Sequence, residues 1–445
     1  MSHYSKEDIL RLVEENDVNF IRLQFTDITG TLKNVAITKS QLKKALDDRC
    51  VFDGSSLDGF ARDAESDMCL WPDRDTFNML PWRPSHYGVA RFICDVYSPE
   101  GAPYEGDPRR ILKKQVAAAA ELGYDFNVGP ECEFFLFRVD DFGQPTASTY
   151  DTAGYFDLDS ADMGGDVRRE ICLTLESMGF EIEASHHEVA GGQHEIDFKY
   201  DTALQAADNI MTFKMAVKSI AQASGMYATF MPKPKTGVSG SGMHINMSLT
   251  KDGKNLFEDP SDPQGNSLSE TAYRFMAGIL AHAKGLTAVC NPTVNSYKRL
   301  VSGYEAPIHV TWSCRNRSPL IRIPSPRGKG SRVELRSPDP SANPYLVFAC
   351  CLAAGLDGIR RKLTPPPAVD KNIFSMTAEE FAQLGIETLP LDLKSAIGEL
   401  KKDEVLTGVL GEHALRNFLL AKESEWTDFS RSVTDWEIAN YLQKY

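Results

Sequence analysis

The chain has 445 residues, 42% of them apolar and 25% charged, and a formal net charge of −14. These values are ordinary for a soluble globular protein with about two domains, and the acidic balance excludes a general nucleic-acid binder. The start has no signal-peptide pattern, and no apolar run reaches the ~20 residues that a membrane helix needs. Nine cysteines without a Cys-x-x-Cys spacing indicate reduced thiols in a cytoplasmic protein.

Short strands dominate the beginning of the chain. Ser5 and Asp8 form a capping-box pattern, which predicts a helix that ends near residue 16. Alternating apolar and polar residues predict strands over 21–25, 32–37 and 89–96. We therefore predict a small β-rich domain over residues 1–104.

A mixed domain is predicted over residues 105–445. Asp107 and Pro108 have the residue types of a helix start. Strands are expected over 130–139, 181–184, 195–199, 242–249 and 332–337. Helices are expected over 166–178, 202–224, 269–288 and 344–362, and the tail from residue 378 reads as helical and amphipathic. The predicted class is α+β.

Chemistry-bearing side chains recur with period two on four of these strands. On each strand they share one face, while apolar residues such as Cys132 and Met243 take the other. The shared-face residues are Glu131 and Glu133; Glu195, Asp197 and Lys199; His244, Asn246 and Ser248; and Arg332, Glu334 and Arg336. If the strands are neighbours, one sheet face gathers several carboxylates with one imidazole.

Crowded glutamates repel one another unless cations lie between them. Several carboxylates with a single histidine form an oxygen-rich ligand set, which favours Mg²⁺ or Mn²⁺ over zinc. The alternative is a solvated sheet face with surface ion pairs. A basic segment, with Arg317, Arg322, Arg327, Lys329 and Arg332, could grip phosphate oxygens or be a solvated loop. Metal carboxylates beside arginines indicate phosphoryl transfer.

Ordered motifs along nearly the whole chain resemble those of bacterial type I glutamine synthetases, in particular the α form of Gram-positive bacteria. They include Phe-Asp-Gly-Ser-Ser, Ser-His-His-Glu-Val-Ala, Gly-Ser-Gly-Met-His and Arg-Val-Glu-Leu-Arg. The matching segments are 52–56, 129–135, 185–190, 192–197, 240–244, 291–300, 303–307, 316–318 and 332–336.

The resemblance implies a β-grasp-like N-terminal domain and a catalytic domain with a curved antiparallel sheet flanked by helices. It implies two Mg²⁺ or Mn²⁺ ions, one held by Glu133, Glu188 and Glu195 and the other by Glu131, His244 and Glu334. ATP would lie near Glu183, Phe198, Asn246, Ser248, Arg317, Arg322 and Lys329. Glutamate would be held by Gly240, Arg299, Glu305 and Arg336, and Arg317 would also act in catalysis.

The activity implied is ATP-dependent ligation of ammonia to L-glutamate through a γ-glutamyl phosphate. Asp53 would take the ammonium proton, and Glu305 would attend the ammonium ion and close the site. The resemblance further implies a homododecamer of two hexameric rings, with Asp53 supplied by a neighbour. It implies feedback inhibition, for which Arg62 is a candidate, and binding to nitrogen-responsive transcription repressors. Neither nucleic acid nor membrane is expected as a partner.

Three positions depart from the family pattern. One is Phe374, which stands where longer type I enzymes carry a regulatory tyrosine, so no adenylylation is expected there. Ser239 stands where an asparagine is usual, and Ser302 replaces a proline. The change at Ser239 keeps open a ligase of the same superfamily that joins glutamate to a polyamine or an alkylamine. A non-catalytic sensor that retains the fold is a third possibility, against which the complete set of metal-type residues argues.

Overall fold

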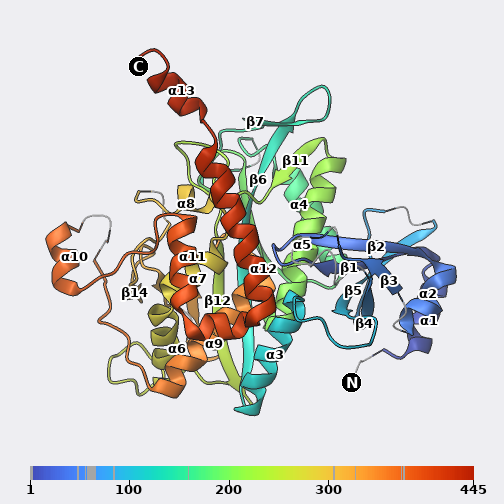
Figure 1. Ribbon diagram of the computed structural model, residues 1–445, viewed down its shortest axis with the longest axis horizontal. Helices are drawn as coiled ribbons and strands as arrows, with labels where there is room; N and C mark the ends of the chain where they lie inside the picture. Colours follow the sequence, from blue (N-terminus) through green and yellow to red (C-terminus); the bar gives the residue numbers. More distant parts are fainter. Residues whose placement is uncertain are drawn as a thin grey trace.

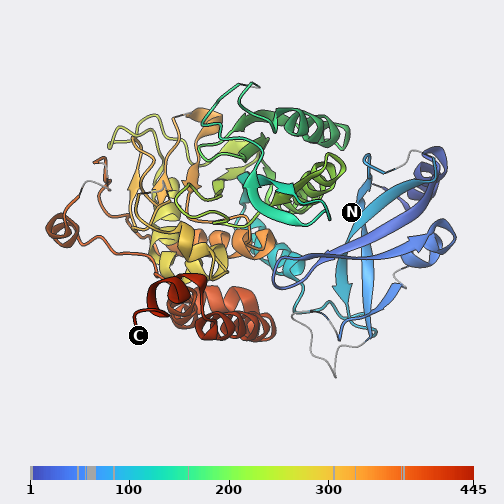
Figure 2. The same ribbon diagram turned by 90° about the horizontal axis from the view of Figure 1, so that it is seen from above.

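Two sheets and their helices organise the chain (Figure 1). The computed structural model describes residues 4–47, 50–55, 57, 67–83, 86–158, 160–303, 306–325, 327–371, 373 and 376–445. The first sheet and the second, larger one lie beside each other, and Figure 2 shows the N-terminal unit to one side of the molecule. The division at residues 104 and 105 stays our proposal.

The first sheet has the order β2-β1-β5-β4-β3. Its strands are β1 (Val18–Thr26), β2 (Leu32–Thr38), β3 (Cys50–Asp53), β4 (Asp67–Met79) and β5 (Gly88–Tyr97). The predicted capping box at Ser5 is present and begins α1 (Lys6–Glu15), and η1 (Lys39–Gln41) leads into α2 (Leu42–Leu46). Alternate residues of β1, such as Ile21 and Leu23, fill a separate small core.

The second sheet follows the order β14-β15-β16-β12-β6-β9-β8, with β7, β10 and β11 also paired to β6 and β13 to β12. Its strands are β6 (Asp125–Val139), β7 (Pro145–Thr149), β8 (Ile182–His187), β9 (Gln193–Phe198), β10 (Asp201–Thr202), β11 (Met226–Thr229), β12 (Met243–Lys251), β13 (Lys254–Asn255), β14 (Trp312–Ser313), β15 (Ile321–Arg322) and β16 (Val333–Leu335). The sheet is antiparallel as predicted, except that β14 and β15 are parallel, because residues 314–320 return the chain to its starting end.

Helices pack on the apolar face of this sheet. They are α3 (Pro108–Glu121), α4 (Gly165–Ser177), α5 (Ala203–Ala223), α6 (Glu270–Ala281), α7 (Ala283–Cys290), α8 (Ser296–Arg299) and α9 (Pro344–Arg361). The short η2 (Gly328–Gly330) instead lies against β13. Phe134 of β6 and Ile245 of β12 share one core with Phe213, Phe275 and Phe348 of α5, α6 and α9. This core fixes which face of the sheet is left for polar side chains.

The helix predicted over 269–288 is divided in two. His282 separates α6 from α7, with its Nδ1 2.7 Å from Asp403 Oδ2 and its Nε2 3.1 Å from Asp357 Oδ2. Both carboxylates come from other parts of the chain, so the helix pattern alone could not predict this break.

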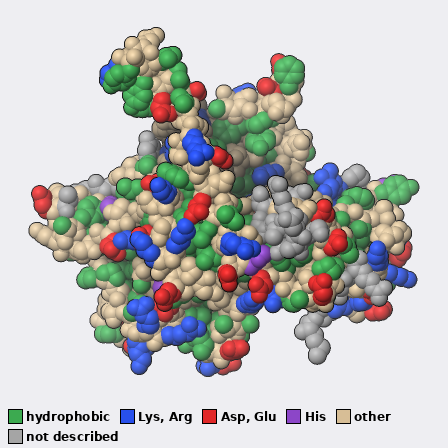
Figure 3. Space-filling model, viewed as in Figure 1, with side chains coloured by type: hydrophobic (Ala, Val, Ile, Leu, Met, Phe, Trp, Pro, Cys, Tyr) green, Lys and Arg blue, Asp and Glu red, His purple; other side chains and the backbone are tan. Residues whose placement is uncertain are grey.

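The tail is helical as predicted, but residues 385–392 interrupt it. Its helices are α10 (Ala378–Leu384), α11 (Leu393–Lys402), α12 (Glu404–Arg431) and α13 (Asp435–Tyr441), and α12 is kinked at Gly411. In Figure 1, α13 projects from the body of the molecule, and Figure 3 shows apolar side chains gathered there. Trp436 and Leu442 are 63% and 70% exposed.

A buried arginine joins the first sheet to helix α5. Arg109, 3% exposed, contacts Asp73 and Asp95 of the first sheet and Asp208 of α5, each at 2.8 Å. Truncating such a cation would leave buried carboxylates without compensation, which is costly. The contact therefore fixes how the N-terminal unit sits on the helices.

All nine cysteines are free, in agreement with the prediction of reduced thiols. Within the part of the chain that the structure describes, no helix combines the length and apolar character needed to cross a bilayer.

We expect Gly358→Ala to destabilise the protein, because a Cβ there would lie 2.1 Å from the carbonyl oxygen of Arg274, where α6 and α9 approach closely. The overpacking should cost about 1–3 kcal/mol, measured by thermal or urea unfolding. Gly408→Ala is the matched control: it is also helical but has no atom within 4 Å, so it should gain up to ~1 kcal/mol from helix propensity. Equal stability of the two variants would contradict the close helix contact.

Candidate active site

The strand register brings the acidic residues together on one sheet face, as alternation predicts. Glu131 of β6 lies opposite His244 of β12 on one side and Asp197 of β9 on the other. Glu133 faces Glu195 in the next row, while Asn246 faces Glu334 of β16. Direct cross-strand partners point to the same side of a sheet, so all of these side chains share the face that the helices leave open.

One ligand group consists of Glu131, His244 and Glu334, whose ligand atoms all lie within 4.8 Å of one another. His244 Nδ1 is 3.3 Å from Glu131 Oε2 and 3.7 Å from Glu334 Oε1. Burial alone would raise the pKa of Glu131, but hydrogen bonds from His244 and Asn246 outweigh it and lower the pKa to about 2. This ionised carboxylate with one imidazole could hold Mg²⁺ or Mn²⁺.

The second predicted group, Glu133, Glu188 and Glu195, is less tightly gathered. The structure places Glu195 within 4.8 Å of His186 and Asp197 instead, and His186 also lies 3.5 Å from Glu188 Oε1. All three glutamates are nevertheless buried close enough for their charges to act on each other.

Repulsion within this second group perturbs its titration. Burial and the charge of Glu188 raise the pKa of Glu133 to about 7, and burial and the charge of Glu131 raise that of Asp197 to about 7. The pKa of Glu195 is also raised, by burial and by Asp197. Like charges held this close titrate normally only when a cation compensates them, so a divalent ion fits the chemistry of the donor set.

Gln193 is a site residue that sequence reasoning missed. Its Nε2, on a side chain that is 1% exposed, donates to Glu133 Oε2 at 2.7 Å and to the Gly240 carbonyl at 3.1 Å. Gly242 N–H donates to the same Glu133 oxygen at 2.9 Å. Gln193 thus joins the acidic face to the loop that carries Gly240. Its position two residues before Glu195, on the same strand face, was the available signal.

His187 and His194, prominent in the sequence, belong to a buried network on the other side of this strand pair. Arg168 donates to Asp162 and lies 3.0 Å from His194 Nδ1, while His187 Nε2 is 3.2 Å from Asp151. Burial and the charge of Arg168 depress the pKa of His194. Because a guanidinium already supplies the positive charge there, we assign this network a structural role.

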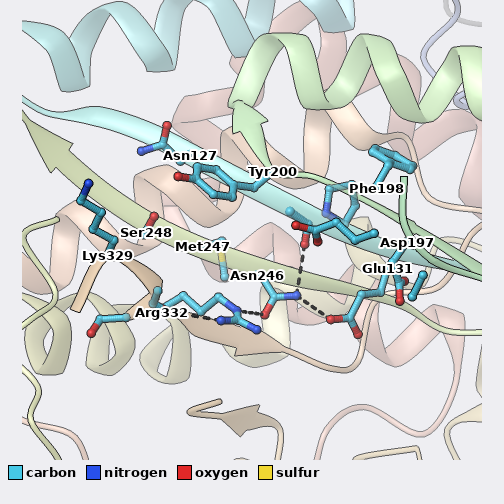
Figure 4. Close-up of a pocket in the computed structure, with 16 residues that line it drawn as sticks. Asn127, Glu131, Asp197, Phe198, Tyr200, Asn246, Met247, Ser248, Lys329 and Arg332 are labelled. Atoms are coloured by element: carbon cyan, nitrogen blue, oxygen red, sulfur yellow. Dashed lines mark hydrogen bonds between the residues drawn. The ribbon is translucent and has the colours of Figure 1, made fainter. Parts of the chain in front are cut away.

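A cavity of 430 Å³ adjoins the first ligand group (Figure 4). Asn246 Nδ2 donates to Glu131 Oε1 at 2.9 Å, and Arg332 Nε donates to Asn246 Oδ1 at 2.8 Å. The volume suits a small-molecule ligand. Five of the residues expected near ATP line it, together with Asp197, Tyr200 and Arg332: Glu183, Phe198, Asn246, Ser248 and Lys329.

The other two residues expected near ATP lie elsewhere. Arg322 does not line the cavity and instead donates to Glu334 Oε2 at 2.7 Å. Arg317 also lies outside the lining and hydrogen-bonds to Tyr155, a residue that sequence reasoning missed. Arg322 thus lies beside the first acidic group, and neither arginine lines the cavity.

The residues expected to hold glutamate meet at one end of β16. Arg299, 3% exposed, donates to the carbonyl oxygens of Ser337 at 2.7 Å and Arg336 at 3.2 Å. A Cβ at Gly240 would lie 3.2 Å from Arg299 Cγ, so this glycine packs directly on the arginine. Arg336 donates through Nε to Glu334, whereas its buried Nη1 has no partner among the described residues. That donor is available to a carboxylate ligand.

Asp53 lies apart from the acidic face. It ends β3, the edge strand opposite β2, and is exposed. Hydrogen bonds from Ser55 lower its pKa, and within the described residues it forms no ion pair with the second sheet. Arg62, Glu305 and Phe374 lie outside the described residues.

Comparisons with known proteins agree along the whole chain. Residues 105–441 match the family model of the glutamine synthetase catalytic domain, and residues 17–99 that of the glutamine synthetase beta-Grasp domain. The chain is similar to the glutamine synthetase of Clostridium saccharobutylicum (61% identity, 100% of both chains) and to that of Staphylococcus aureus strain Mu50 (54%, 99% of both). A solved structure described as a GmaS/ADP complex has a TM-score of 0.89 and 36% identity, covering 98% of this chain and 99% of its own.

The raised carboxyl pKa values predict a pH-dependent stability. A carboxyl whose pKa is higher in the folded than in the unfolded chain stabilises fully below the unfolded value and loses this contribution as pH rises through the folded value. For Glu133 and Asp197 the window runs from about pH 4 to about pH 7. We therefore expect the thermal midpoint of chelator-treated protein to fall across this window, and added Mg²⁺ to reduce the fall.

Asp197→Asn is the control variant for this experiment, because it removes one of the two titrating groups. Its midpoint should fall less steeply with pH than that of the unchanged protein. Identical slopes would show that the acidic face does not titrate in this range.

Proposed function

Because this chain belongs to the glutamine synthetase family and ligates ammonia to L-glutamate with the use of ATP, we propose roles for the residues of its acidic face and the adjoining cavity. The observation that carries the proposal is the row of cross-strand partners around Glu131, which unites carboxylates, an imidazole and a cavity of 430 Å³. The reaction needs ATP, a charged co-substrate, next to L-glutamate, whose side chain is an acidic acceptor. The acidic face and the adjoining cavity offer neighbouring positions for the two.

Two divalent ions, Mg²⁺ or Mn²⁺, would be held by the face. Glu131, His244 and Glu334 would hold one, and Glu133, Glu188 and Glu195 the other. Such ions supply charge neutralisation for phosphate oxygens. The raised pKa values of Glu133 and Glu195 support the second assignment, because burial and the neighbouring carboxylates outweigh the nearby positive charges of the protein.

ATP would occupy the cavity of Figure 4, with Tyr200 and Phe198 offering apolar surface for the base and Lys329 and Arg332 offering cations. The similarity to a chain described as an ADP complex supports a nucleotide here. Arg317 and Arg322 would neutralise the transferred phosphoryl group, since Arg322 already lies against Glu334.

L-Glutamate would bind between Gly240, Arg299 and Arg336. The unpaired Nη1 of Arg336 would donate to a substrate carboxylate, and Arg299 would keep the backbone at 336–337 in place. Ser239 would leave the α-amino end with fewer contacts than the amide usual at this position.

The chemistry requires activation of the glutamate side chain, because a carboxylate oxygen is a poor leaving group. Its γ-carboxylate attacks the γ-phosphate of ATP, which gives γ-glutamyl phosphate and ADP. Ammonia then attacks the acyl carbon, and inorganic phosphate leaves. Asp53, kept ionised by Ser55, would attract ammonium and take its proton, and Glu305 would complete the ammonium site and help to exclude water.

Asp53 needs a second subunit to reach the acidic face, because its own β3 lies at the far edge of the first sheet. A site shared between neighbours agrees with the dodecamer of two hexameric rings that we propose. The exposed apolar residues of α13 would form a contact between rings. A cytoplasmic location, feedback inhibition through Arg62 and binding of nitrogen-responsive repressors complete the proposal.

The Asp53 role predicts a substrate-dependent defect. Asp53→Asn should reduce turnover with ammonium by about 10²-fold, since no carboxylate remains to take the proton. Turnover with hydroxylamine, which is largely unprotonated at neutral pH, should fall much less. Phosphate release with glutamate, ATP and Mg²⁺ measures both, and alkylamines provide a third arm.

Equal losses with both nucleophiles would remove the proton-acceptor role from Asp53. Release with alkylamines but not with ammonium would overturn the ammonium chemistry proposed for the site.

The metal assignment predicts that Glu334→Gln lowers turnover by about 10³-fold, equivalent to several kcal/mol of transition-state stabilisation. The oligomer should persist in size-exclusion chromatography, and Mn²⁺ binding measured by calorimetry should lose one event. Glu258→Gln, in a loop outside the acidic face, is the control. Full activity of Glu334→Gln would contradict the assignment.

A further inference from the structure

A basic cavity lies between the first sheet and α5, away from the acidic face. It has a volume of 200 Å³, and its charged lining residues are Arg22, Lys33 and Arg83. Gln24, Asn34 and Ser219 add polar groups. None of the described lining residues is acidic, although the whole chain carries a net charge of −14. The cavity therefore concentrates positive charge on an acidic protein.

A second cavity continues the first. It has a volume of 590 Å³ and shares Leu32, Met215 and Ser219 with the smaller one. It adds Lys214 and Lys218, four residues apart on α5, and again no acidic residue among those described in its lining. Lys214 donates to the Pro340 carbonyl at 2.5 Å, so its charge is partly satisfied by the backbone.

Arg22 carries unused hydrogen-bonding capacity. It projects from β1 on the side opposite Ile21 and Leu23, and its Nη1 donates to Asn34 Oδ1 at 3.2 Å. Its buried Nε has no partner among the described residues. Burial and the charge of Arg83 lower the pKa of Arg22. Both guanidinium groups line the same cavity, and like charges repel each other unless an anion lies between them.

The carboxylate that contacts Lys33 does not supply that anion. Asp27 lies 3.4 Å from Lys33 Nζ but is itself buried and does not line the cavity. Within the described residues, no carboxylate forms an ion pair with Arg22 or Arg83.

We propose that the smaller cavity binds a small organic or inorganic anion with at least two negative charges, of the dicarboxylate or phosphate class. Arginine forks recognise both classes through paired N–H donors. The volume is below the ~300–1,000 Å³ of sites for larger ligands, so a compact anion fits better than a nucleotide. Since β1 and α5 both contribute lining residues, the ligand bridges the N-terminal unit and the helices.

This site is separate from catalysis. None of its lining residues lines the cavity of Figure 4 or belongs to the two acidic groups. However, Thr229–Pro232 contact the adjoining larger cavity, and the Pro232 carbonyl accepts the Ser241 N–H at 2.8 Å beside Gly240. The backbone segment 229–232 thus connects the larger cavity, which adjoins the proposed anion site, to the proposed glutamate-binding loop.

Isothermal titration calorimetry of the full chain tests the site. The protein is first saturated with L-glutamate and a non-hydrolysable ATP analogue, so that substrate positions are filled. Succinate, glutarate and inorganic phosphate are then titrated in separate arms. We expect one binding event per chain in at least one arm, with the affinity reduced about tenfold or more in both Arg22→Gln and Arg83→Gln.

Lys43→Gln is the matched control, because Lys43 is an exposed cation of α2 outside both cavities. It should leave the affinity unchanged. A response only to dicarboxylates assigns the carboxylate class, and a response only to phosphate assigns the phosphate class.

The absence of binding in all arms overturns the proposal, as does binding that both arginine variants leave unchanged. If Arg22→Gln fails to fold, Arg83→Gln decides alone, since Arg83 is exposed and its replacement removes no core contact.

Discussion

Repulsion between carboxylates on a single sheet face is the constraint around which the larger unit is built. β6 supplies Glu131 and Glu133. Its neighbour β9 adds Glu195 and Asp197, and its neighbour β12 carries Asn246, which faces Glu334 of β16. The opposite face is apolar and locked against α5, so these side chains cannot turn away from one another. The chain tolerates the arrangement because His244, two arginines and the amide of Gln193 surround it. A bound divalent cation, as proposed above, would compensate the remaining repulsion, and its occupancy would then be coupled to stability.

Charge is also distributed unevenly over the rest of the molecule. Acidic groups concentrate on the open face of the second sheet and around Arg109, whose single guanidinium contacts three aspartates. Cations concentrate along the seam between β1 and α5. The N-terminal unit is thus held to the helices by the buried, paired charge of Arg109 at one place. At another it borders a basic cavity in which, among the described residues, Arg22 and Arg83 form no ion pair with a carboxylate. A bound anion would compensate the positive charge of the cavity, whereas Arg109 already has three aspartate partners.

Local patterns predicted a large part of this structure. The period of two placed Glu131, Glu133, His244 and Glu334 on common faces, because side-chain direction along a strand depends only on sequence spacing. The contacts between residues on different strands and helices could not be predicted from sequence spacing. The contact of His186 with Glu195 and that of Gln193 with Glu133 depend on cross-strand register, and the break at His282 depends on Asp357 and Asp403. Asp53 ends an edge strand of the first sheet, away from the acidic face, and its proposed pairing with a neighbouring subunit is not encoded by any local pattern.

The central position of β6 in the second sheet also limits which insertions and deletions the protein can tolerate. This strand pairs with five others, and its register decides at once which residues meet β12 and β9. Inserting or deleting one codon within it would turn every later side chain to the other face, placing glutamates in the core and phenylalanines in the cavity. Substitutions can therefore accumulate along the strand one at a time, whereas length variation should be confined to the exposed turn at 140–144 that joins it to β7.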